Sequence, residues 1–205
     1  MRINKFLSSL GIASRRAIDK YIEEGRIKVN GVITSTGIDV TEDDEIYIDN
    51  KKIETKRIEE KVYFMLNKPL EVLSASSDDR GRKTVVDLIK TDKRIFPIGR
   101  LDYMTSGLIL LTNDGELFNR LVHPKSEIYK KYYIKVFGEV KKEEIEELKK
   151  GVLLEDGKTL PAKISGIKYD KNKTSMYISI REGRNRQIRR MIEKFGYKVL
   201  MLRRE

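Results

Sequence analysis

The chain has 205 residues, with 43 Lys plus Arg against 32 Asp plus Glu, and therefore a formal net charge of +11. It contains no cysteine and a single histidine, His123, which excludes disulfide scaffolds, thiol nucleophiles and histidine-rich metal sites. The longest apolar runs fall far below the roughly 18 residues of a membrane helix, so we expect a cytoplasmic protein without a membrane span. The excess of cations predicts a polyanionic partner, with nucleic acid ahead of a membrane surface.

The first part of the chain predicts two short helices. Apolar residues recur at helical spacing over residues 3–10, and Gly11 supplies the left-handed position that ends such a helix. Ser14 is a favourable N-cap for a second helix, which Gly25 ends. The basic, serine-containing first 18 residues also fit a targeting leader. We favour the folded helix pair, because Gly11 and Ser14 mark a stop and a restart.

Short strands follow the helix pair, and a linker separates them from a second domain. Asn-Gly turns between apolar pieces are strong hairpin signals, and the predicted strands are residues 27–29, 32–33 and 45–48. Residues 54–60 are highly charged with one apolar residue, which predicts a linker. We therefore divide the chain into domains at residues 1–60 and 61–205.

The second domain shows more strands than helices, and its strands cluster in consecutive pairs. This pattern predicts an α+β fold in which the larger domain has a mixed, mostly antiparallel sheet. The predicted strands are residues 62–66, 72–75, 107–112, 131–137, 160–165, 176–180 and 198–202. The predicted helices are residues 84–89, 116–122, 141–150 and 185–195.

One carboxylate lies just before the most apolar strand of the chain. Asp102 stands between Arg100 and a Thr-Ser-Gly run at residues 105–107, which places an acid at the mouth of the core. With no cysteine and one histidine, catalysis would depend on carboxylates, hydroxyls, Lys, Arg or Tyr. An Asp followed by Thr-Ser-Gly is also common turn chemistry, and on spacing alone this structural interpretation is favoured.

Both ends of the chain are basic. Residues 181–205 carry nine cations and three acids, and residues 1–31 carry seven cations and three acids. We interpret the two ends as two contacts with one polyanion, with solvated helix faces as the alternative.

Five motifs resemble those of the RsuA/RluB family of ribosomal RNA pseudouridine synthases. The catalytic motif of that family is similar to Gly99-Arg-Leu-Asp-x-x-Thr-Ser-Gly-Leu-x-Leu-Leu-Thr-Asn-Asp-Gly115. The other four are Asn67-Lys-Pro69, Glu116-Leu-x-Asn-Arg-Leu-x-His-Pro124, Lys130-x-Tyr132-x-Ile-x-Val136 and Glu182-Gly-Arg-Asn-Arg-Gln-Ile-Arg-Arg-Met191. The first domain resembles the αL (S4-type) RNA-binding domain, through Ser14-Arg15-Arg16-Ala17 and Gly25-x-Ile-x-Val-Asn-Gly31.

The resemblance implies an enzyme that isomerises uridine in place without a cofactor or metal. Asp102 matches the catalytic carboxylate, which acts as a nucleophile or as a base toward the sugar. Arg189 matches the basic residue that pairs with this carboxylate and keeps it ionised; a surface arginine bonded to Glu193 is the alternative. Tyr132 matches the aromatic residue that stacks on a flipped base; a core tyrosine is the alternative, and Tyr133 leaves the register open by one.

The resemblance also implies which residues bind RNA. Arg100 matches a residue that helps displace the target from its helix, and the basic ends supply the others: Arg15, Arg16, Lys20, Arg186, Gln187 and Arg190. The implied partner is ribosomal RNA, and residues 115–124 favour the large-subunit branch, as free RNA or as an assembly particle. We expect a monomer.

Two other functions fit parts of the pattern. One is a non-catalytic RNA-binding ribosome-assembly factor whose Asp102 is structural. The other is a glycosidase that pairs Asp102 with Asp78 or Asp79, although neither acid lies in a matching motif. Family members usually continue past the closing helix with a further strand and tail, so we interpret the second domain, which stops at Glu205, as C-terminally short.

Overall fold

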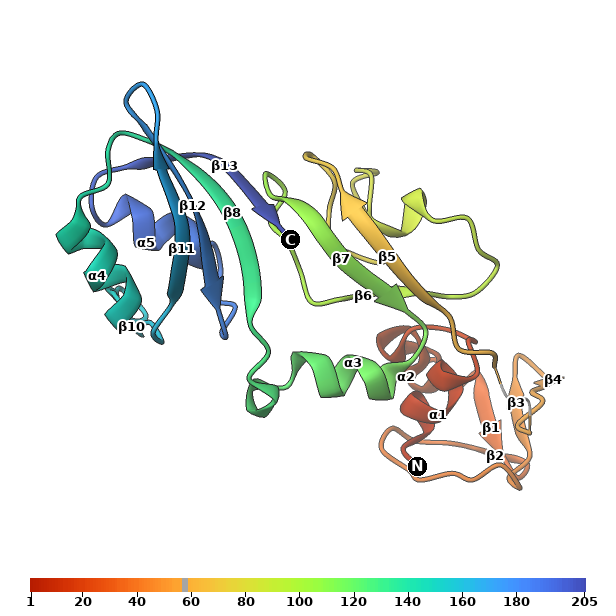
Figure 1. Ribbon diagram of the computed structural model, residues 1–205. Helices are drawn as coiled ribbons and strands as arrows, with labels where there is room; N and C mark the ends of the chain where they lie inside the picture. The colour runs from red at the N-terminus through yellow and green to blue at the C-terminus, as the bar shows by residue number, and fades with distance from the viewer. Residues whose placement is uncertain (57–58) are drawn as a thin grey trace. The chain divides into compact units, whose positions relative to one another are not determined.

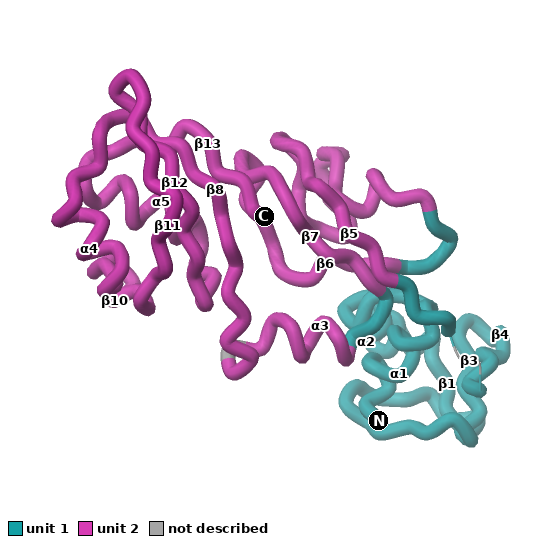
Figure 2. Tube along the Cα trace, viewed as in Figure 1, with its two compact units in different colours: residues 1–62, 91–94, 113–115 teal, residues 63–90, 95–112, 116–205 magenta. Residues whose placement is uncertain are grey.

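The computed structural model describes residues 1–56 and 59–205, and its described part divides into two compact units (Figure 1). Figure 2 shows the first unit, residues 1–62, 91–94 and 113–115, and the second unit, which holds the remainder. Within the described residues, no helix has both the length and the apolar character needed to cross a membrane. The predicted linker, residues 54–60, contains Arg57 and Ile58, which lie outside the described residues.

The first unit consists of two helices and a four-stranded antiparallel sheet. The helices are α1 (Ile3–Ser9) and α2 (Arg15–Glu23). The sheet has the order β2-β1-β3-β4 and is formed by β1 (Ile27–Val29), β2 (Val32–Ile33), β3 (Ile46–Ile48) and β4 (Lys51–Lys52). Apolar residues of both layers form one buried core: Ile3, Leu7, Ile18, Ile22, Ile27, Val40, Ile46 and Ile48.

Local sequence signals explain where the two helices begin and end. The Ser14 hydroxyl accepts a hydrogen bond from the Ala17 backbone N–H at 3.1 Å, so it caps α2 as predicted. Gly11 and Gly25 follow the helices with φ of 76° and 69°, in the left-handed region that favours glycine. Burial of the apolar stripe turns the basic side of α2 outward, and Arg15, Arg16 and Lys20 are exposed.

The second unit is built on a seven-stranded mixed sheet. The order is β11-β12-β8-β13-β7-β5, with β6 also paired to β7. The strands are β5 (Tyr63–Lys68), β6 (Phe96–Ile98), β7 (Ser106–Thr112), β8 (Lys130–Phe137), β11 (Lys163–Tyr169), β12 (Lys173–Ile180) and β13 (Lys198–Arg204). Every pair is antiparallel except β13 with β7, which is parallel. The predicted α+β class with a mostly antiparallel sheet is confirmed.

Shorter elements complete the chain. The helices are α3 (Gly115–Val122), α4 (Lys142–Lys150) and α5 (Gln187–Glu193), with 3₁₀ turns η1 (Val86–Leu88) and η2 (Pro124–Ser126). Strands β9 (Leu153–Leu154) and β10 (Gly157–Lys158) form a separate hairpin. Helix α5 lies against β13 and α4 lies against β11.

The two faces of the sheet differ in burial. Ile134, Val136, Met176 and Ile178 alternate along β8 and β12 and are completely buried, and five of the seven residues of α5 are buried with them. This inner face and the helices therefore form the core of the second unit. Tyr132 has the same parity as Ile134, so it also points inward.

Two predicted elements are wrong. Residues 72–75 form no strand, because only Leu73 pairs, in an isolated bridge with Thr84, and the neighbouring Ser74 side chain bonds the backbone of Leu101 instead. Residues 84–89 contain only the short η1, which begins after the Thr84 amide bonds the Asp87 carboxylate at 2.7 Å. Strand β6 was not predicted, since Pro97 at its centre lacks the N–H that a strand needs.

Candidate active site

Asp102 lies in the loop between β6 and β7, and hydrogen bonds fix four consecutive carbonyl groups of this loop. The carbonyl of Leu101 accepts from the Ser74 hydroxyl at 2.9 Å, and that of Asp102 accepts from the Thr105 N–H at 3.0 Å. The carbonyls of Tyr103 and Met104 accept hydrogen bonds from the side chains of Lys68 and Arg189, as described below. The loop backbone is therefore held from several sides, which presents the Asp102 side chain in a defined position.

The Asp102 carboxylate itself is left free by this network. It is half-buried, and among the described residues no hydrogen bond or ion pair within 4.0 Å involves its side chain. Its charge nevertheless acts on Lys68, Tyr132 and Arg189. Burial lowers the pKa of Lys68 and Arg189 and raises that of Tyr132, and the Asp102 charge acts in the raising direction on all three. An ionisable group without a bonded partner, surrounded by tyrosine and cations, is typical of a reacting group.

The Lys68 side chain holds the loop that contains Asp102. Its side chain is completely buried, and its Nζ donates to the carbonyls of Pro69 and Val72 at 2.8 Å each and to that of Tyr103 at 3.4 Å. Burial lowers the pKa of Lys68, and the Asp102 charge opposes this change. These contacts give Lys68 a supporting role in the loop.

We expect Lys68→Met to reduce the free energy of unfolding by roughly 2–3 kcal/mol, because the buried Val72 carbonyl and the part-buried carbonyls of Pro69 and Tyr103 lose their shared donor. Lys83→Met, at an exposed position of the same unit, is the matched control. Denaturant unfolding of both variants measures the effect. Equal unfolding midpoints for the two would contradict the anchoring role.

Arg189 on α5 reaches the same loop. It is 8% exposed, and its Nη2 donates to the Met104 carbonyl at 2.6 Å and to the Thr105 hydroxyl at 3.4 Å. Burial lowers the pKa of Arg189, while the Asp102 charge raises it. Its Nε is buried and has no hydrogen-bond partner among the described residues.

The sequence alternative for Arg189 is wrong. A surface arginine bonded to Glu193 is not seen, because Arg189 is buried and the Glu193 carboxylate pairs with Arg186 at 3.8 Å. Arg189 comes close enough to Asp102 for their charges to interact, although no ion pair of 4.0 Å or less joins them in the described structure.

Tyr132 lines the same cavity from β8. It is 8% exposed, and burial raises its pKa, while the charge of Arg204 and a hydrogen bond from it act in the opposite direction. Arg204 is its direct neighbour on β13. The phenol therefore remains protonated at neutral pH. Sequence reasoning missed Arg204, because only the pairing of β13 with β8 brings it there.

The cavity holds about 70 Å³ and brings together the predicted residues Arg100, Asp102, Tyr132, Arg186 and Gln187. Arg100 and Arg186 are exposed, so their guanidinium groups can meet an anion at the rim. The Gln187 amide is already used, since it donates to Glu182 at 2.6 Å and accepts from the Arg184 N–H at 3.1 Å.

Other predicted RNA-binding residues are not among those that line this cavity. Arg190 pairs with Asp156 at 2.9 Å and does not line the cavity. Arg15, Arg16 and Lys20 belong to the first unit, on the exposed side of α2. There Lys20 pairs with Glu24 at 3.7 Å.

The glycosidase alternative requires a second acid near Asp102, and neither candidate lines the cavity. The lining residues include Asp102 and neither Asp78 nor Asp79. Hydrogen bonds from Arg82 hold the pKa of Asp78 at about 2, so this group cannot act as a general acid near neutral pH. Asp79 is exposed.

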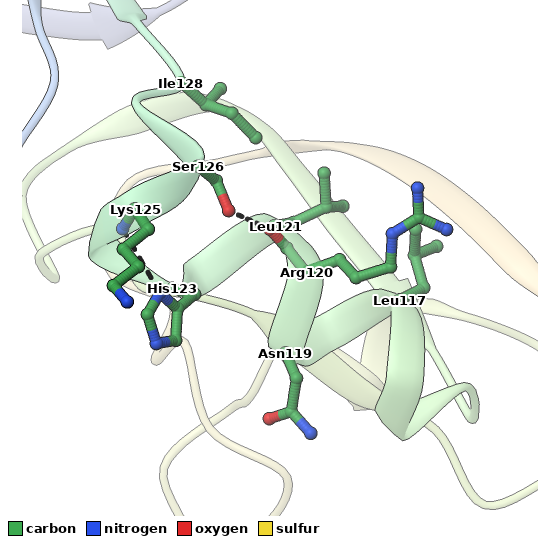
Figure 3. A pocket seen from close by; sticks show the side chains of 8 residues that line it. All are labelled: Leu117, Asn119, Arg120, Leu121, His123, Lys125, Ser126 and Ile128. Carbon is green, nitrogen blue, oxygen red and sulfur yellow. Dashed lines mark hydrogen bonds between the residues drawn. The ribbon is translucent and has the colours of Figure 1, made fainter.

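A larger hollow of about 670 Å³ lies along α3 and η2 (Figure 3). Its lining surface is mainly apolar, with Arg120 and Lys125 as the cations and no carboxylate. The Lys125 N–H bonds His123 Nδ1 at 3.2 Å, and the Ser126 hydroxyl bonds the Arg120 carbonyl (Figure 3). These contacts hold the end of α3, which is a structural role for His123.

The comparisons with known proteins agree with this fold and cavity. Residues 62–194 match the RNA pseudouridylate synthase family, and residues 1–46 match the S4 domain. The chain is 51% identical to ribosomal large subunit pseudouridine synthase B of Bacillus subtilis (strain 168), over all of this chain and 84% of that protein. It is 37% identical to the dual-specificity RNA pseudouridine synthase RluF of Escherichia coli (strain K12), over all of this chain and 69% of that protein.

A solved structure extends the agreement to three dimensions. A crystal structure of pseudouridylate synthase matches with a TM-score of 0.67 and 31% identity, over all of this chain and 87% of the other. The mixed sheet with a carboxylate, a tyrosine and an arginine at one cavity thus defines an RNA-modifying isomerase. The chain belongs to the RNA pseudouridylate synthase family, which confirms the resemblance found in its motifs.

Proposed function

We propose that this enzyme converts a specific uridine of ribosomal RNA to pseudouridine at the cavity that contains Asp102. The single observation that supports this site best concerns the Asp102 carboxylate. It has no hydrogen bond or ion pair within 4.0 Å in the described structure, while hydrogen bonds hold the backbone of its loop. A pseudouridine synthase breaks the N1–C1′ bond, rotates the base and joins C5 to C1′, while the C5 proton is lost and N1 gains one. The product is an isomer of the substrate.

Each residue at the cavity has a part in the proposal. Asp102 acts on the sugar, as a nucleophile or as a base. Arg189, which does not itself line the cavity, positions the loop through its hydrogen bond to the Met104 carbonyl. Tyr132 stacks on the flipped uracil, which offsets the stacking lost from the RNA. Arg100 and Arg186 at the rim bind the phosphates on either side.

The substrate class follows from the relatives. The Bacillus relative is named for the large ribosomal subunit, and it is 51% identical to this chain, so we propose a large-subunit RNA, free or in an assembly particle, as the substrate. The S4 domain in residues 1–46 supplies a second RNA contact, which raises the affinity because it is linked to the catalytic unit. We propose that the enzyme acts as a monomer.

Product analysis tests this function. Unmodified small-subunit and large-subunit ribosomal RNA are incubated separately with the protein, and pseudouridine is mapped in each. We expect one new pseudouridine in the large-subunit RNA and none in the small-subunit RNA. Binding without product in either RNA or in assembly particles would instead favour the non-catalytic assembly factor.

Two substitutions of Tyr132 distinguish the contribution of its ring to activity from that of its hydroxyl group. Tyr132→Phe retains the stacking surface, and we expect its kcat to stay within about fivefold of wild type. Tyr132→Ala loses the surface, and a loss of about 100-fold is expected from the 1–3 kcal/mol of a stacked base. Single-turnover assays measure both, with Tyr63→Ala, at a 57% exposed position, as the control. Equal rates for the Phe and Ala variants would disprove the stacking role.

A further inference from the structure

The outer face of the sheet in the second unit carries an unusual set of side chains. In β8, β11, β12 and β13, which run side by side (Figure 1), the paired registers place 14 residues on the face opposite Tyr132. Seven of them are cations, three are aromatic, three are serines and one is methionine, with no Asp or Glu among them. All are half-buried or exposed. We call these residues the outer platform.

Aromatic rings lie at the centre of the outer platform, with cations around them. Tyr133 and Tyr177 are direct cross-strand neighbours, and their rings meet edge to face at 5.5 Å. Lys131 lies 4.3 Å from the Tyr177 ring centre, and Arg203 lies 5.8 Å from that of Tyr133. Gly166 leaves room for this pair, because a Cβ there would lie 3.0 Å from the Tyr177 ring.

The lysines of the outer platform have no acidic partners. In the described structure no ion pair of 4.0 Å or less involves Lys131, Lys135, Lys163, Lys168, Lys173 or Lys198, and only Arg203 has one, with Glu205 at 2.9 Å. Cross-strand neighbours on an exposed sheet face commonly combine opposite charges, which stabilises the sheet. Here Lys131 faces Ser179, and Lys135 faces Ser175 and Met201. The face therefore accumulates positive charge that no ion pair with these lysines compensates in the described structure.

Protection of a sheet edge does not account for this pattern. Lysines that prevent aggregation belong on edge strands, and Lys163 and Lys168 on β11 fit that role. Lys131, Lys135 and Arg203 lie instead on β8 and β13, each of which has a neighbouring strand on both sides. The half-buried tyrosines between them give no protection against aggregation.

We propose that the outer platform binds single-stranded RNA, as a further RNA contact on the face of the sheet opposite the catalytic cavity. Bases stack on Tyr133 and Tyr177, and phosphates lie along the lysines, which is how sequence-tolerant sheet surfaces bind single strands. A duplex would meet the lysines, but its bases are paired and cannot reach the rings. RNA flanking the target can thus be held while the target uridine occupies the cavity.

Binding of a ten-nucleotide oligouridylate to the full chain tests the proposal, with an RNA duplex of equal length as the comparison. We expect Tyr133→Leu/Tyr177→Leu to bind the single strand about tenfold more weakly and the duplex as wild type does. Lys131→Ala/Lys135→Ala should reduce the slope of log affinity against log salt by about 1.4, since each lysine at a single strand releases about 0.7 counterion. Lys142→Ala/Lys150→Ala removes the same charge from exposed positions of α4 and should change the slope less.

Three results would overturn the proposal. One is an unchanged affinity of the tyrosine variant for the single strand, as expected if a protein covers this face. Another is an equal change of slope in the two lysine variants, which would indicate general charge alone. The third is crosslinking of 4-thiouridine oligonucleotides only at the catalytic cavity, with none at Tyr133 or Tyr177. Binding is measured without chemistry. Failure of pseudouridine formation would therefore not contradict RNA binding at the outer platform, and failure of that binding would not contradict the proposed reaction.

Discussion

Asp102→Asn is expected to reduce pseudouridine formation by about 10³-fold or more, the usual cost of removing a group that reacts with the substrate. The amide has the size of the carboxylate but can act neither as a nucleophile nor as a base. Because no hydrogen bond or ion pair within 4.0 Å involves the carboxylate in the described structure, we expect the free energy of unfolding to change by less than about 0.5 kcal/mol. RNA affinity should be kept or increased, since one negative charge is removed from the cavity.

The matched control is Asp79→Asn, which makes the same chemical change at an exposed position of the same unit. Single-turnover conversion of ribosomal RNA, with binding measured on the same preparations, separates chemistry from recognition. Conversion by Asp102→Asn at the rate of Asp79→Asn would rule out the proposed mechanism. Loss of binding together with loss of product would show that Asp102 contributes to recognition instead.

The spacing of apolar residues and the local cap signals predicted the parts of the fold that nearby residues determine. The α1–α2 pair depends on Gly11 and Ser14, whose signals act within a few residues. The sequence left the register open between Tyr132 and Tyr133, and the pairing of β8 with β12 places Tyr132 on the inner face with Ile134. Strand β6 and the irregular residues 72–75 were not predictable in this way. Pro97 argues against a strand unless β7 is known to lie beside it, and the Ser74 hydroxyl bonds a backbone 27 residues away.

The candidate site shows the same division. Asp102 stood out because of its position before an apolar strand, but the groups that fix its loop come from β5 and α5, far apart in the sequence. Lys68, Arg204 and the loop contact of Arg189 become meaningful only after the strands have paired. The count of basic residues at the C-terminal end also overstated the free charge, because Arg184 donates to the backbone of the β9–β10 hairpin and Arg190 pairs with Asp156.

Gly107 is expected to be essential to the cavity for a steric reason. It has a φ of 106° and pairs with Arg204 where β7 and β13 run parallel. A Cβ at this position would lie 2.5 Å from the Arg204 nitrogen and closer still to its carbonyl oxygen. Both atoms belong to the backbone, so no side-chain movement relieves the clash, and β13 has to move away from β7.

We therefore expect Gly107→Ala to lower the free energy of unfolding by about 4 kcal/mol, from the clash and the unfavourable φ together. For a chain of this size the melting temperature should fall by roughly 10 °C. Activity should fall further than stability explains, because β13 carries Leu202 to the cavity and places Arg204 beside Tyr132. Gly115→Ala, where a Cβ meets nothing within 4 Å, should melt within about 2 °C of wild type. Thermal unfolding of the two alanine variants compares them directly, and equal melting temperatures would show that β13 can pair with β7 without the glycine.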